Sequence, residues 1–389
     1  MAPLPGDAPI GVYVHVPFCV HICPYCDFNT YAGQEDRIPS YVDAVVADLR
    51  QEAARIGPRP VDSVFFGGGT PSLLPADSVA QIVQAIQAEF RLAPDAEVTM
   101  EANPNGLDLR YLEAVRAGGV NRLSIGLQTT DRRGLRVLGR MHEAATAEAA
   151  VADAVRAGFE RISLDLIFGW PGQSTASWER DLETVLGWSG GALRHLSLYA
   201  LIVEPGTPMA DAVARGIVTV PDDDATADLY ELAIARLKEA GWQHYEIANF
   251  ATAVDQQSVH NRIYWRNGEY LGIGAGAHGR IGDERAMRHL LPATYIRTVP
   301  AGESPVSNVE VIDAALAEGE TMMLGLRLLA EGVSREAFLD RHGRALDAVF
   351  GEIVAEQVGL GLVEDDGHRV RLTERGMMVA NEVVAAYLL

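Results

Sequence analysis

Runs of apolar, β-branched residues alternate with amphipathic segments of helical periodicity through the first 247 residues of the chain. This alternation predicts seven strands, at residues 12–16, 61–66, 97–100, 122–125, 161–166, 195–198 and 244–247. The helices predicted between them lie at residues 40–56, 76–90, 109–117, 144–157, 177–188 and 225–240. Strands that are separated by helices pair in parallel, so the chain is expected to be an α/β protein built as a partial, TIM-like β/α barrel.

The predicted strands end on polar or glycine-rich residues, all in the same sense. The first strand leads into a loop with three cysteines, and the second leads into Gly67-Gly68-Gly69-Thr70-Pro71. The next four end at Glu101, Gln128, Asp165 and Tyr199. Polar residues also cap ordinary strands, but six such ends together favour a functional site, because the carboxyl ends of barrel strands share one rim.

Cys19, Cys23 and Cys26 lie close together, and no other cysteine occurs among the 389 residues. An odd, clustered set is a poor disulfide framework. Three thiolates are one short of the four that a structural zinc ion or a closed iron–sulfur cluster takes. Either another residue completes the set, with His15 and His21 nearest for zinc, or one iron stays open for a ligand.

The charge of the chain limits its partners. It has 32 Lys and Arg against 53 Asp and Glu, a formal net charge of -21, and such a surface repels a phosphate backbone, so nucleic acid is not an expected partner. No apolar run is long enough for a transmembrane helix. Residues 1–7 lack the basic and apolar regions of a secretory signal, so a cytoplasmic location is expected.

Past Asn249 the alternation of strands and helices ends. Helices are predicted at residues 309–329, 335–341 and 345–358, followed by a hairpin at 362–372 and a last helix from Glu374. Helices followed by a two-stranded wing indicate a winged-helix-like domain. The expected domains are the barrel over residues 8–245, a segment over 246–300 that packs against it, and the C-terminal helical domain over 301–389.

The cysteine spacing and the glycine run together resemble the radical S-adenosylmethionine (SAM) superfamily. The pattern is Cys19-x3-Cys23-x2-Cys26, with Tyr25 before the last cysteine, followed by the glycines at 67–69. The resemblance implies that the cysteines hold a 4Fe-4S cluster whose open iron binds the amino and carboxylate groups of SAM. It also implies that transfer of one electron can cleave SAM to a 5′-deoxyadenosyl radical.

Further motifs resemble the anaerobic coproporphyrinogen III oxidase family, from about residue 10 to the C-terminus. They lie at residues 13–19 (YVHVPFC), 100–104 (MEANP), 124–128 (SIGLQ), 138–140 (LGR), 164–172 (LDLIFGWPG) and 264–279. The resemblance implies that SAM is held by Tyr13, Tyr25, Gly68, Gly69, Glu101, Gln128, Arg140 and Asp165. Whether a second SAM binds is left open.

Two departures from the oxidase favour its HemW branch, whose members bind heme and pass it to acceptor proteins. The oxidase has a further cysteine two residues after the third, where this chain has Phe28, and it has a long segment before the cysteine loop, for which this chain has no room. The stretches 23–29 (CPYCDFN) and 260–265 (HNRIYW) resemble the HemW branch instead.

By this resemblance His260, Tyr264 and Trp265 are candidate heme contacts. His260 is expected in a polar loop, where a histidine is more often a hydrogen-bonding surface residue than an iron ligand. Imidazole is nevertheless a common axial ligand of heme, and the two aromatic rings could form a flat wall for the macrocycle.

The sequence therefore predicts a radical SAM partial β/α barrel with a winged-helix-like C-terminal domain, acting as a heme chaperone. The expected cofactors are a 4Fe-4S cluster and SAM, with heme as cargo, and the expected partners are heme-accepting proteins, plus an electron donor if SAM is cleaved. Two alternatives stay open: oxidative decarboxylation of coproporphyrinogen III, and another radical SAM reaction on a tetrapyrrole, such as heme ring opening by radical methylation. Enzymatic activity is left open, and the chaperone interpretation expects no coproporphyrinogen oxidase activity.

Overall fold

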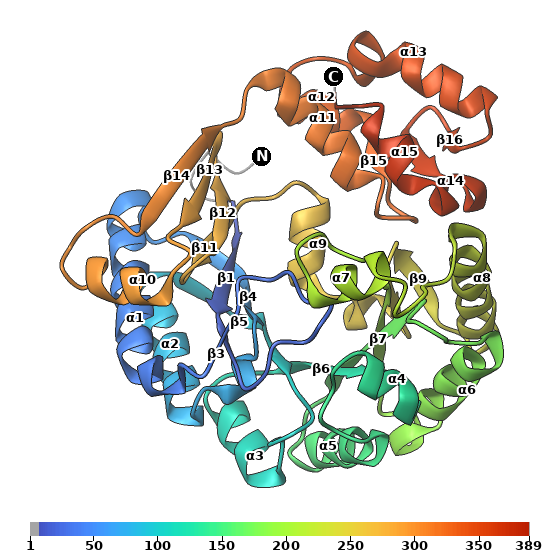
Figure 1. Ribbon diagram of the computed structural model, residues 1–389. Helices are drawn as coiled ribbons and strands as arrows, with labels where there is room; N and C mark the ends of the chain where they lie inside the picture. The colour runs from blue at the N-terminus through green and yellow to red at the C-terminus, as the bar shows by residue number, and fades with distance from the viewer. Residues whose placement is uncertain (1–7, 389) are drawn as a thin grey trace.

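The computed structural model describes residues 8–388, which form a curved twelve-stranded sheet with helices packed on its outer side (Figure 1). The strand order is β14-β13-β12-β11-β1-β4-β5-β6-β7-β8-β10-β9. The strands that pair in parallel at its centre are β1 (Ile10–Val16), β4 (Pro60–Gly68), β5 (Arg91–Ala102), β6 (Arg122–Gln128), β7 (Arg161–Phe168) and β8 (His195–Ala200). The helices outside them are α1 (Ile38–Ile56), α2 (Ala76–Glu89), α3 (Leu109–Ala117), α5 (Ala144–Arg156), α6 (Thr175–Leu186) and α8 (Asp223–Glu239). The expected α/β partial barrel is confirmed.

The central strands are buried on both faces, as parallel strands require. In β1, Val12, Val14 and Val16 are fully buried in the main hydrophobic core, which also contains Val45 and Leu49 of α1. The alternate residues of the strand point to the barrel interior. Polar side chains can therefore occupy every second position without entering the apolar core.

The seventh predicted strand exists, but it does not continue the parallel barrel. It is β9 (Gln243–Glu246), and β10 (Asn249–Ala251) lies between it and β8, antiparallel to both. Only two residues join β9 to β10, and a parallel crossover needs a dozen or more, so the chain turns back as a hairpin.

On its other side the sheet continues into an extension that the sequence did not reveal. β11 (Tyr270–Ile273) pairs in parallel with β1, and β12 (His278–Ile281), β13 (Glu284–Arg288) and β14 (Val306–Val311) follow in antiparallel order. The predicted helix at 309–329 is therefore wrong at its start. Valines at 306, 309 and 311 favour a strand, and the Asp313 side chain accepts a hydrogen bond from Leu316 N to begin α11 (Ala314–Gly325).

The C-terminal part has its own hydrophobic core, built around Met322, Phe338 and Phe350. Its further elements are α12 (Arg335–His342), α13 (Leu346–Gly359), β16 (Val363–Asp365), β17 (Arg369–Leu372), α14 (Glu374–Met378) and α15 (Ala380–Ala385). A short strand, β15 (Val333–Ser334), pairs with β17, so the wing has three strands rather than two. The expected winged-helix-like character is confirmed with this change.

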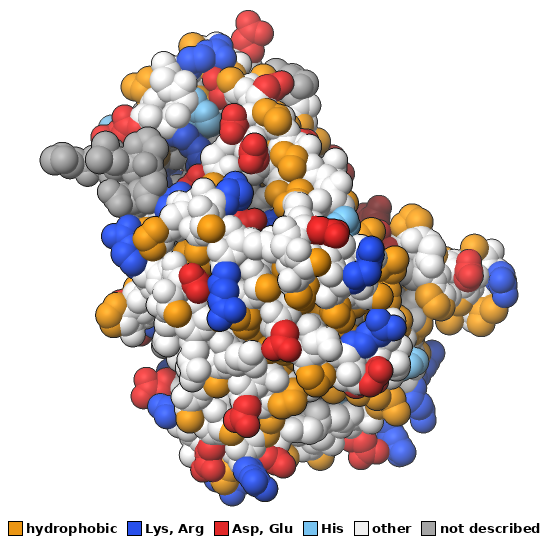
Figure 2. All heavy atoms as spheres, turned by 90° about the vertical axis from the view of Figure 1, so that its left-hand side faces the viewer, with side chains coloured by type: hydrophobic (Ala, Val, Ile, Leu, Met, Phe, Trp, Pro, Cys, Tyr) orange, Lys and Arg blue, Asp and Glu red, His pale blue; other side chains and the backbone are white. Residues whose placement is uncertain are grey.

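Short elements complete the chain: β2 (Phe18–Cys19), β3 (Tyr31–Ala32), α4 (Arg132–Val137), α7 (Pro208–Ala214), α9 (Val259–Trp265) and α10 (Pro292–Thr298). In Figure 1, α4 and α7 lie in front of the barrel, at the carboxyl ends of the strands, and α9 lies between the sheet and α11. The face that carries α1 and α10 shows charged side chains of both signs between apolar ones (Figure 2). No helix within residues 8–388 has the length and apolarity needed to cross a membrane.

Candidate cluster and cofactor site

The cysteine loop follows β1 and is held against the glycine run by backbone hydrogen bonds. Gly69 N donates to Val16 O (2.8 Å), and Thr70 N donates to Phe18 O (2.9 Å). The Thr70 hydroxyl lies 3.5 Å from Cys19 Sγ. All three cysteines are free thiols; Cys19 is buried and the other two are partly exposed. The first cysteine is thus fixed in the protein while the loop reaches toward solvent.

Glycine at 68 and 69 is what lets the end of β4 lie so close to this loop. A Cβ on Gly69 would meet Phe18 O at 2.7 Å and Cys19 Sγ at 3.0 Å. Gly68 has a φ of +112°, and a Cβ there would lie 2.6 Å from the His15 ring. The run therefore forms a narrow backbone cradle beside the thiols, as expected for backbone contact with a ligand.

Arg140 and Gln128 converge on the same place from β6 and the turn after α4. Arg140 donates to Gly126 O (2.8 Å) and to Cys23 Sγ (3.7 Å). Gln128 has a φ of +71°, which is uncommon for a residue other than glycine. A Cβ on Gly126 would lie 2.8 Å from the Gln128 amide nitrogen and 3.2 Å from Arg140 Nη2. Both predicted SAM residues therefore lie beside Gly126, and Arg140 also contacts the cysteine loop.

Two carboxyl groups, those of Glu101 and Asp165, lie beside the cradle. Glu101 accepts a hydrogen bond from Gly68 N (3.2 Å), and Asp165 accepts one from Ser124 Oγ (2.9 Å). Burial raises the pKa of Glu101 to about 8, with repulsion by Asp165 adding to it, and burial raises the pKa of Asp165 to about 6. Neither carboxylate forms an ion pair with another residue between 8 and 388, so a cationic ligand would be stabilised here. The sulfonium group of SAM fits that requirement.

Tyr13 and Tyr25, the two predicted aromatic contacts, lie on different sides of this site. Tyr13 donates or accepts a hydrogen bond with His15 Nδ1 (2.9 Å) and faces the barrel interior. Tyr25 packs against a small apolar cluster formed by Leu138, Ile167 and Trp170. Tyr25 therefore anchors the cysteine loop to β7 and to the turn after α4.

The spacing of the thiols differs from that of a site for one metal ion. No three His, Cys, Asp or Glu side chains within the described residues converge on a single ion position. A structural zinc ion needs four ligand atoms about 2.0–2.3 Å from one point, and neither His15 nor His21 completes such a set. Each cysteine of a 4Fe-4S cluster binds its own iron, so three thiols without a fourth ligand among the described residues fit a cluster with one open iron better than zinc.

A cavity of about 230 Å³ opens into the barrel below the two carboxylates. Its walls carry Tyr13, Phe65, Thr99, Glu101, Arg122, Ser124, Ser163, Asp165, His195, Ser197, Tyr199, Ser258, His260, Asn261 and Tyr264. Two hydrogen-bonded chains close its floor. In one, His260 links Ser63 Oγ to the Tyr264 hydroxyl (2.8 Å each); in the other, His195 links Ser163 Oγ (2.7 Å) to the Tyr245 hydroxyl (2.9 Å). We call these six residues the floor.

The expectation that His260 lies in a polar loop is wrong. It lies in α9, which begins where the Ser258 side chain accepts from Asn261 N, and it is fully buried in the barrel. Both of its ring nitrogens are hydrogen-bonded, and burial lowers its pKa to about 3. Ligation of iron by this imidazole would require one of these two hydrogen bonds to break, and a heme contact at His260 stays a prediction.

Tyr264 and Trp265 do not form a common wall. The Tyr264 hydroxyl points into the cavity, toward His260. The Trp265 ring instead faces the C-terminal domain, where the Arg327 guanidinium lies 4.3 Å from its centroid. Glu331 of that domain pairs with Arg262 and Arg266 of the same short segment. The HNRIYW segment thus joins the cavity floor to the C-terminal domain.

Sequence reasoning missed the polar interior of the barrel. Arg122 pairs with Glu97 (3.5 Å) inside it, and Glu97 also accepts from His260 N (3.1 Å). The available signal was the alternation within strands, since Ser63, Ser124 and Ser163 stand at inward positions of otherwise apolar runs.

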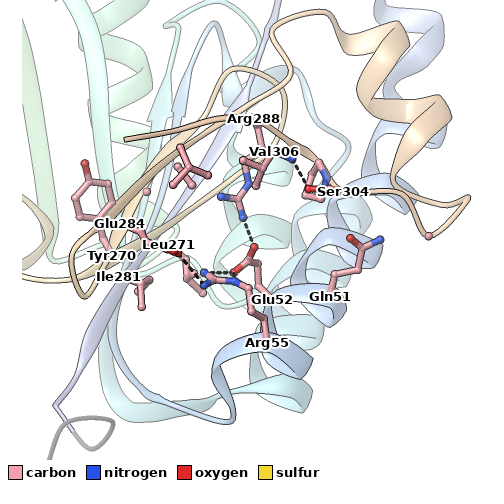
Figure 3. A pocket seen from close by; sticks show the side chains of 15 residues that line it. Gln51, Glu52, Arg55, Tyr270, Leu271, Ile281, Glu284, Arg288, Ser304 and Val306 are labelled. Carbon is pink, nitrogen blue, oxygen red and sulfur yellow. Dashed lines mark hydrogen bonds and ion pairs between the residues drawn. The ribbon is translucent and has the colours of Figure 1, made fainter. Parts of the chain in front are cut away.

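A larger cavity, of about 470 Å³, lies away from the thiols, between α1 and the β11–β14 extension (Figure 3). Its buried Arg288 pairs with Glu52 (2.8 Å) and Asp48 (3.4 Å), and Arg55 also pairs with Glu52. Tyr295 of α10 donates to Asp48 (2.7 Å). These charged groups pair with one another and hold α1, β13 and α10 together. Because they are already paired and the cavity lies away from the cysteines, the larger cavity is not the candidate site.

Comparison with known proteins identifies both parts of the chain. Residues 13–185 match the Radical SAM superfamily, and residues 319–379 match the HemN C-terminal domain. The fold is similar to that of coproporphyrinogen III oxidase (HemN) from Escherichia coli, with a TM-score of 0.84 over 98% of this chain and 91% of that one. At 22% sequence identity this likeness shows the fold alone.

Curated relatives match over nearly the full length. Proteins named heme chaperone HemW are 36% identical over 379 residues in Bacillus subtilis and 38% identical over 394 residues in Mycobacterium tuberculosis. These matches cover 97% and 100% of this chain, and 99% and 97% of the relatives. A mouse protein named radical S-adenosyl methionine domain-containing protein 1, mitochondrial, is 40% identical over 97% of this chain and 87% of its own length. At this identity and coverage, the chain belongs to the HemW family of radical SAM proteins.

Proposed function

We propose that the chain binds heme and passes it to acceptor proteins, and that it carries a 4Fe-4S cluster with SAM at the open iron. Cys19, Cys23 and Cys26 would hold the cluster. Tyr13, Tyr25, Gly68, Gly69, Glu101, Gln128, Arg140 and Asp165 would surround SAM. When bound, such a cluster offers an iron coordination site to the amino and carboxylate groups of SAM and can pass it one electron.

The observation that carries this proposal is the meeting of three thiols, a glycine run and two half-buried carboxyl groups without ion-pair partners in residues 8–388, all at one rim. Glycines at 68 and 69 let the end of β4 lie directly against the cysteine loop, because a Cβ there would meet the His15 ring or Phe18 O, and exposed backbone of this kind suits contacts with an amino acid ligand. Arg140 donates a hydrogen bond to Cys23 Sγ (3.7 Å), which places a cation beside the proposed cluster ligands. Relatives named heme chaperones support heme as the cargo.

The dimensions of the barrel cavity argue against a tetrapyrrole reacting inside it. Sites that enclose a drug-sized ligand have volumes of about 300–1,000 Å³, and this cavity has about 230 Å³. A tetrapyrrole is larger than most such ligands. Decarboxylation of coproporphyrinogen III would need a propionate carbon beside SAM within this space, so we propose that the chain is not that oxidase. A cytoplasmic location and the need for an electron donor stay predictions.

The test uses anaerobically purified, cluster-reconstituted protein in two parallel assays. In the first, heme is titrated and its Soret band followed, and the loaded protein is then mixed with apomyoglobin as a heme acceptor. In the second, coproporphyrinogen III, SAM and a reductant are supplied, and released carbon dioxide is measured. The Cys23→Ala variant shows which signals depend on the cluster.

We expect one heme per chain, transfer of heme to apomyoglobin, and no release of carbon dioxide above the Cys23→Ala background. Many turnovers of carbon dioxide per chain, with no Soret shift on heme addition, would show an oxidase instead.

A further inference from the structure

We propose that heme docks on the outer surface of the cysteine loop, at the mouth of the barrel, rather than in its interior. This surface, here called the mouth face, consists of Val20, His21, Ile22, Phe28 and Met141. The inference rests on the proposed function and adds to it the place and the contacts of the cargo.

The mouth face is unusually apolar for a surface exposed to water. Val20, Phe28 and Met141 are 66%, 67% and 73% exposed, and Ile22 is also exposed. Four large apolar side chains on one loop and its neighbour are more than scattered surface residues, and exposed apolar patches mark binding sites. A porphyrin ring has two wide apolar faces that such a surface can cover.

The two segments of the mouth face lie together. A Cβ on Gly139 would lie 2.4 Å from Pro24 Cδ and 3.6 Å from His21 Nε2, so the turn that leads to Met141 packs directly on the cysteine loop. Pro24 O accepts a hydrogen bond from Met209 N of α7 (2.8 Å). The loop is thus supported from two sides and presents its remaining side chains outward.

His21 gives this surface the chemistry of an iron ligand. It is exposed, and its ring makes no hydrogen bond or ion pair with the described part of the chain. Imidazole and thioether are the axial ligands of many heme proteins, and Met141 lies two residues beyond the glycine that contacts His21. His260, in contrast, has no free nitrogen.

The charge around the mouth face complements the two heme propionates. In a chain of net charge -21, helix α4 carries Arg132, Arg133 and Arg136, and Arg136 O accepts a hydrogen bond from Gly139 N (3.1 Å). Arg133 and Arg136 are exposed and form no ion pair within residues 8–388. An exposed arginine without an ion-pair partner can form two parallel hydrogen bonds to a carboxylate. The cysteine loop itself has no Lys or Arg between residues 19 and 28. The apolar area and the cationic area are therefore adjacent but separate, which matches the apolar ring and the anionic propionate edge of heme.

The test is heme titration of the full-length, cluster-reconstituted protein, followed by the Soret band. His21→Ala is compared with His368→Ala, which removes another exposed histidine in the C-terminal domain. Arg136→Glu is compared with Arg116→Glu, because Arg116 is an exposed arginine at the opposite end of the barrel, in the last turn of α3. Iron content is measured for each variant, and the arginine pair decides the question if His21→Ala reduces cluster loading.

We expect His21→Ala to weaken heme binding about tenfold or more and to shift the Soret maximum, and Arg136→Glu to weaken it about threefold. Both controls should bind as wild type does. If the wild type binds heme and both mouth variants match their controls, the mouth face is not the heme site and serves another partner, such as an electron donor. If the wild type binds no heme, the proposed function itself is wrong.

Discussion

The mouth and the floor of the barrel each contain a histidine, and the two have opposite settings. His21 at the mouth is exposed and free of partners in the described chain, beside exposed apolar side chains and unpaired arginines. His260 at the floor is fully buried, neutral, and bonded through both ring nitrogens. A ligand can use only the first without breaking existing hydrogen bonds. The difference teaches that the residue type in a motif does not establish its role until its partners are known.

The same contrast applies to the groups around each histidine. At the mouth, three thiols and two carboxylates have few protein partners, so a bound cofactor can supply the missing contacts. At the floor, serines, histidines and tyrosines satisfy one another. We therefore expect mutations of the thiols and of His21 at the mouth to change cofactor or heme binding with little effect on folding, and mutations at the floor to do the reverse.

The largest expected effect is the loss of the cluster in Cys23→Ala. Wild-type protein reconstituted without oxygen should contain about four irons per chain, and the variant should contain almost none, because two thiolates cannot hold the cluster. Iron analysis and the visible absorption spectrum measure this. Zinc in the purified wild type, with no iron taken up on reconstitution, would contradict the cluster assignment.

His260→Ala should produce the largest loss of stability. It leaves Ser63 Oγ and the Tyr264 hydroxyl without their buried partner and creates a cavity, which should lower the free energy of unfolding by about 2–4 kcal/mol. His368→Ala should change it by less than about 0.5 kcal/mol. Urea unfolding of the apoprotein measures both. Equal stabilities for the two variants would mean that the floor contributes nothing to folding.

The sequence predicted the parallel barrel and its rim well, because the features that indicate them lie within short stretches of sequence. Strands such as β1 and β7 are nearly continuous apolar runs, and the chemistry at their ends lies within a few residues in sequence. The floor was missed because its hydrogen bonds join residues as distant as Ser63 and His260. β14 was read as helix because its pairing with β13 across 17 intervening residues leaves no local signal beyond three valines.

The sequence motif gives Gly68 only a role in ligand approach, and the structure adds a second one. At a φ of +112° and against the His15 ring, Gly68 is required by the fold itself. Gly68→Val is therefore expected to destabilise the barrel as well as weaken SAM binding. Glu101→Gln is the better probe of SAM, because the amide oxygen can still accept from Gly68 N.

The two regions should also respond oppositely to pH. Burial lowers the pKa of His260 to about 3, so an unfolded chain takes up a proton below pH 6.5 that the folded chain refuses, and stability falls on acidification by up to about 1.4 kcal/mol per pH unit. Burial raises the pKa of Glu101 to about 8 from an ordinary 4.5, so its contribution to stability is lost as pH rises through that range.

Urea unfolding of the apoprotein between pH 5 and 8.5 tests this. His260→Gln should flatten the acidic limb of the stability profile, and Glu101→Gln should flatten the alkaline limb. Identical profiles for both variants and wild type would show that these groups titrate normally.

The smallest expected effect concerns the link between α9 and the C-terminal domain. Glu331 pairs with Arg262 and Arg266, and it is about one-third exposed. Glu331→Gln should lower stability by less than about 1 kcal/mol, because such ion pairs are screened by water and salt. A loss of heme binding in this variant would instead connect the C-terminal domain to the cargo.

The comparison of mouth and floor is tested most directly by one heme titration of His21→Ala and His260→Gln, side by side, in cluster-reconstituted protein. We expect His21→Ala to bind heme about tenfold more weakly than wild type, and His260→Gln to bind it with unchanged affinity and an unchanged Soret maximum. The opposite result, with affinity lost in His260→Gln and kept in His21→Ala while both proteins remain folded, would contradict the account.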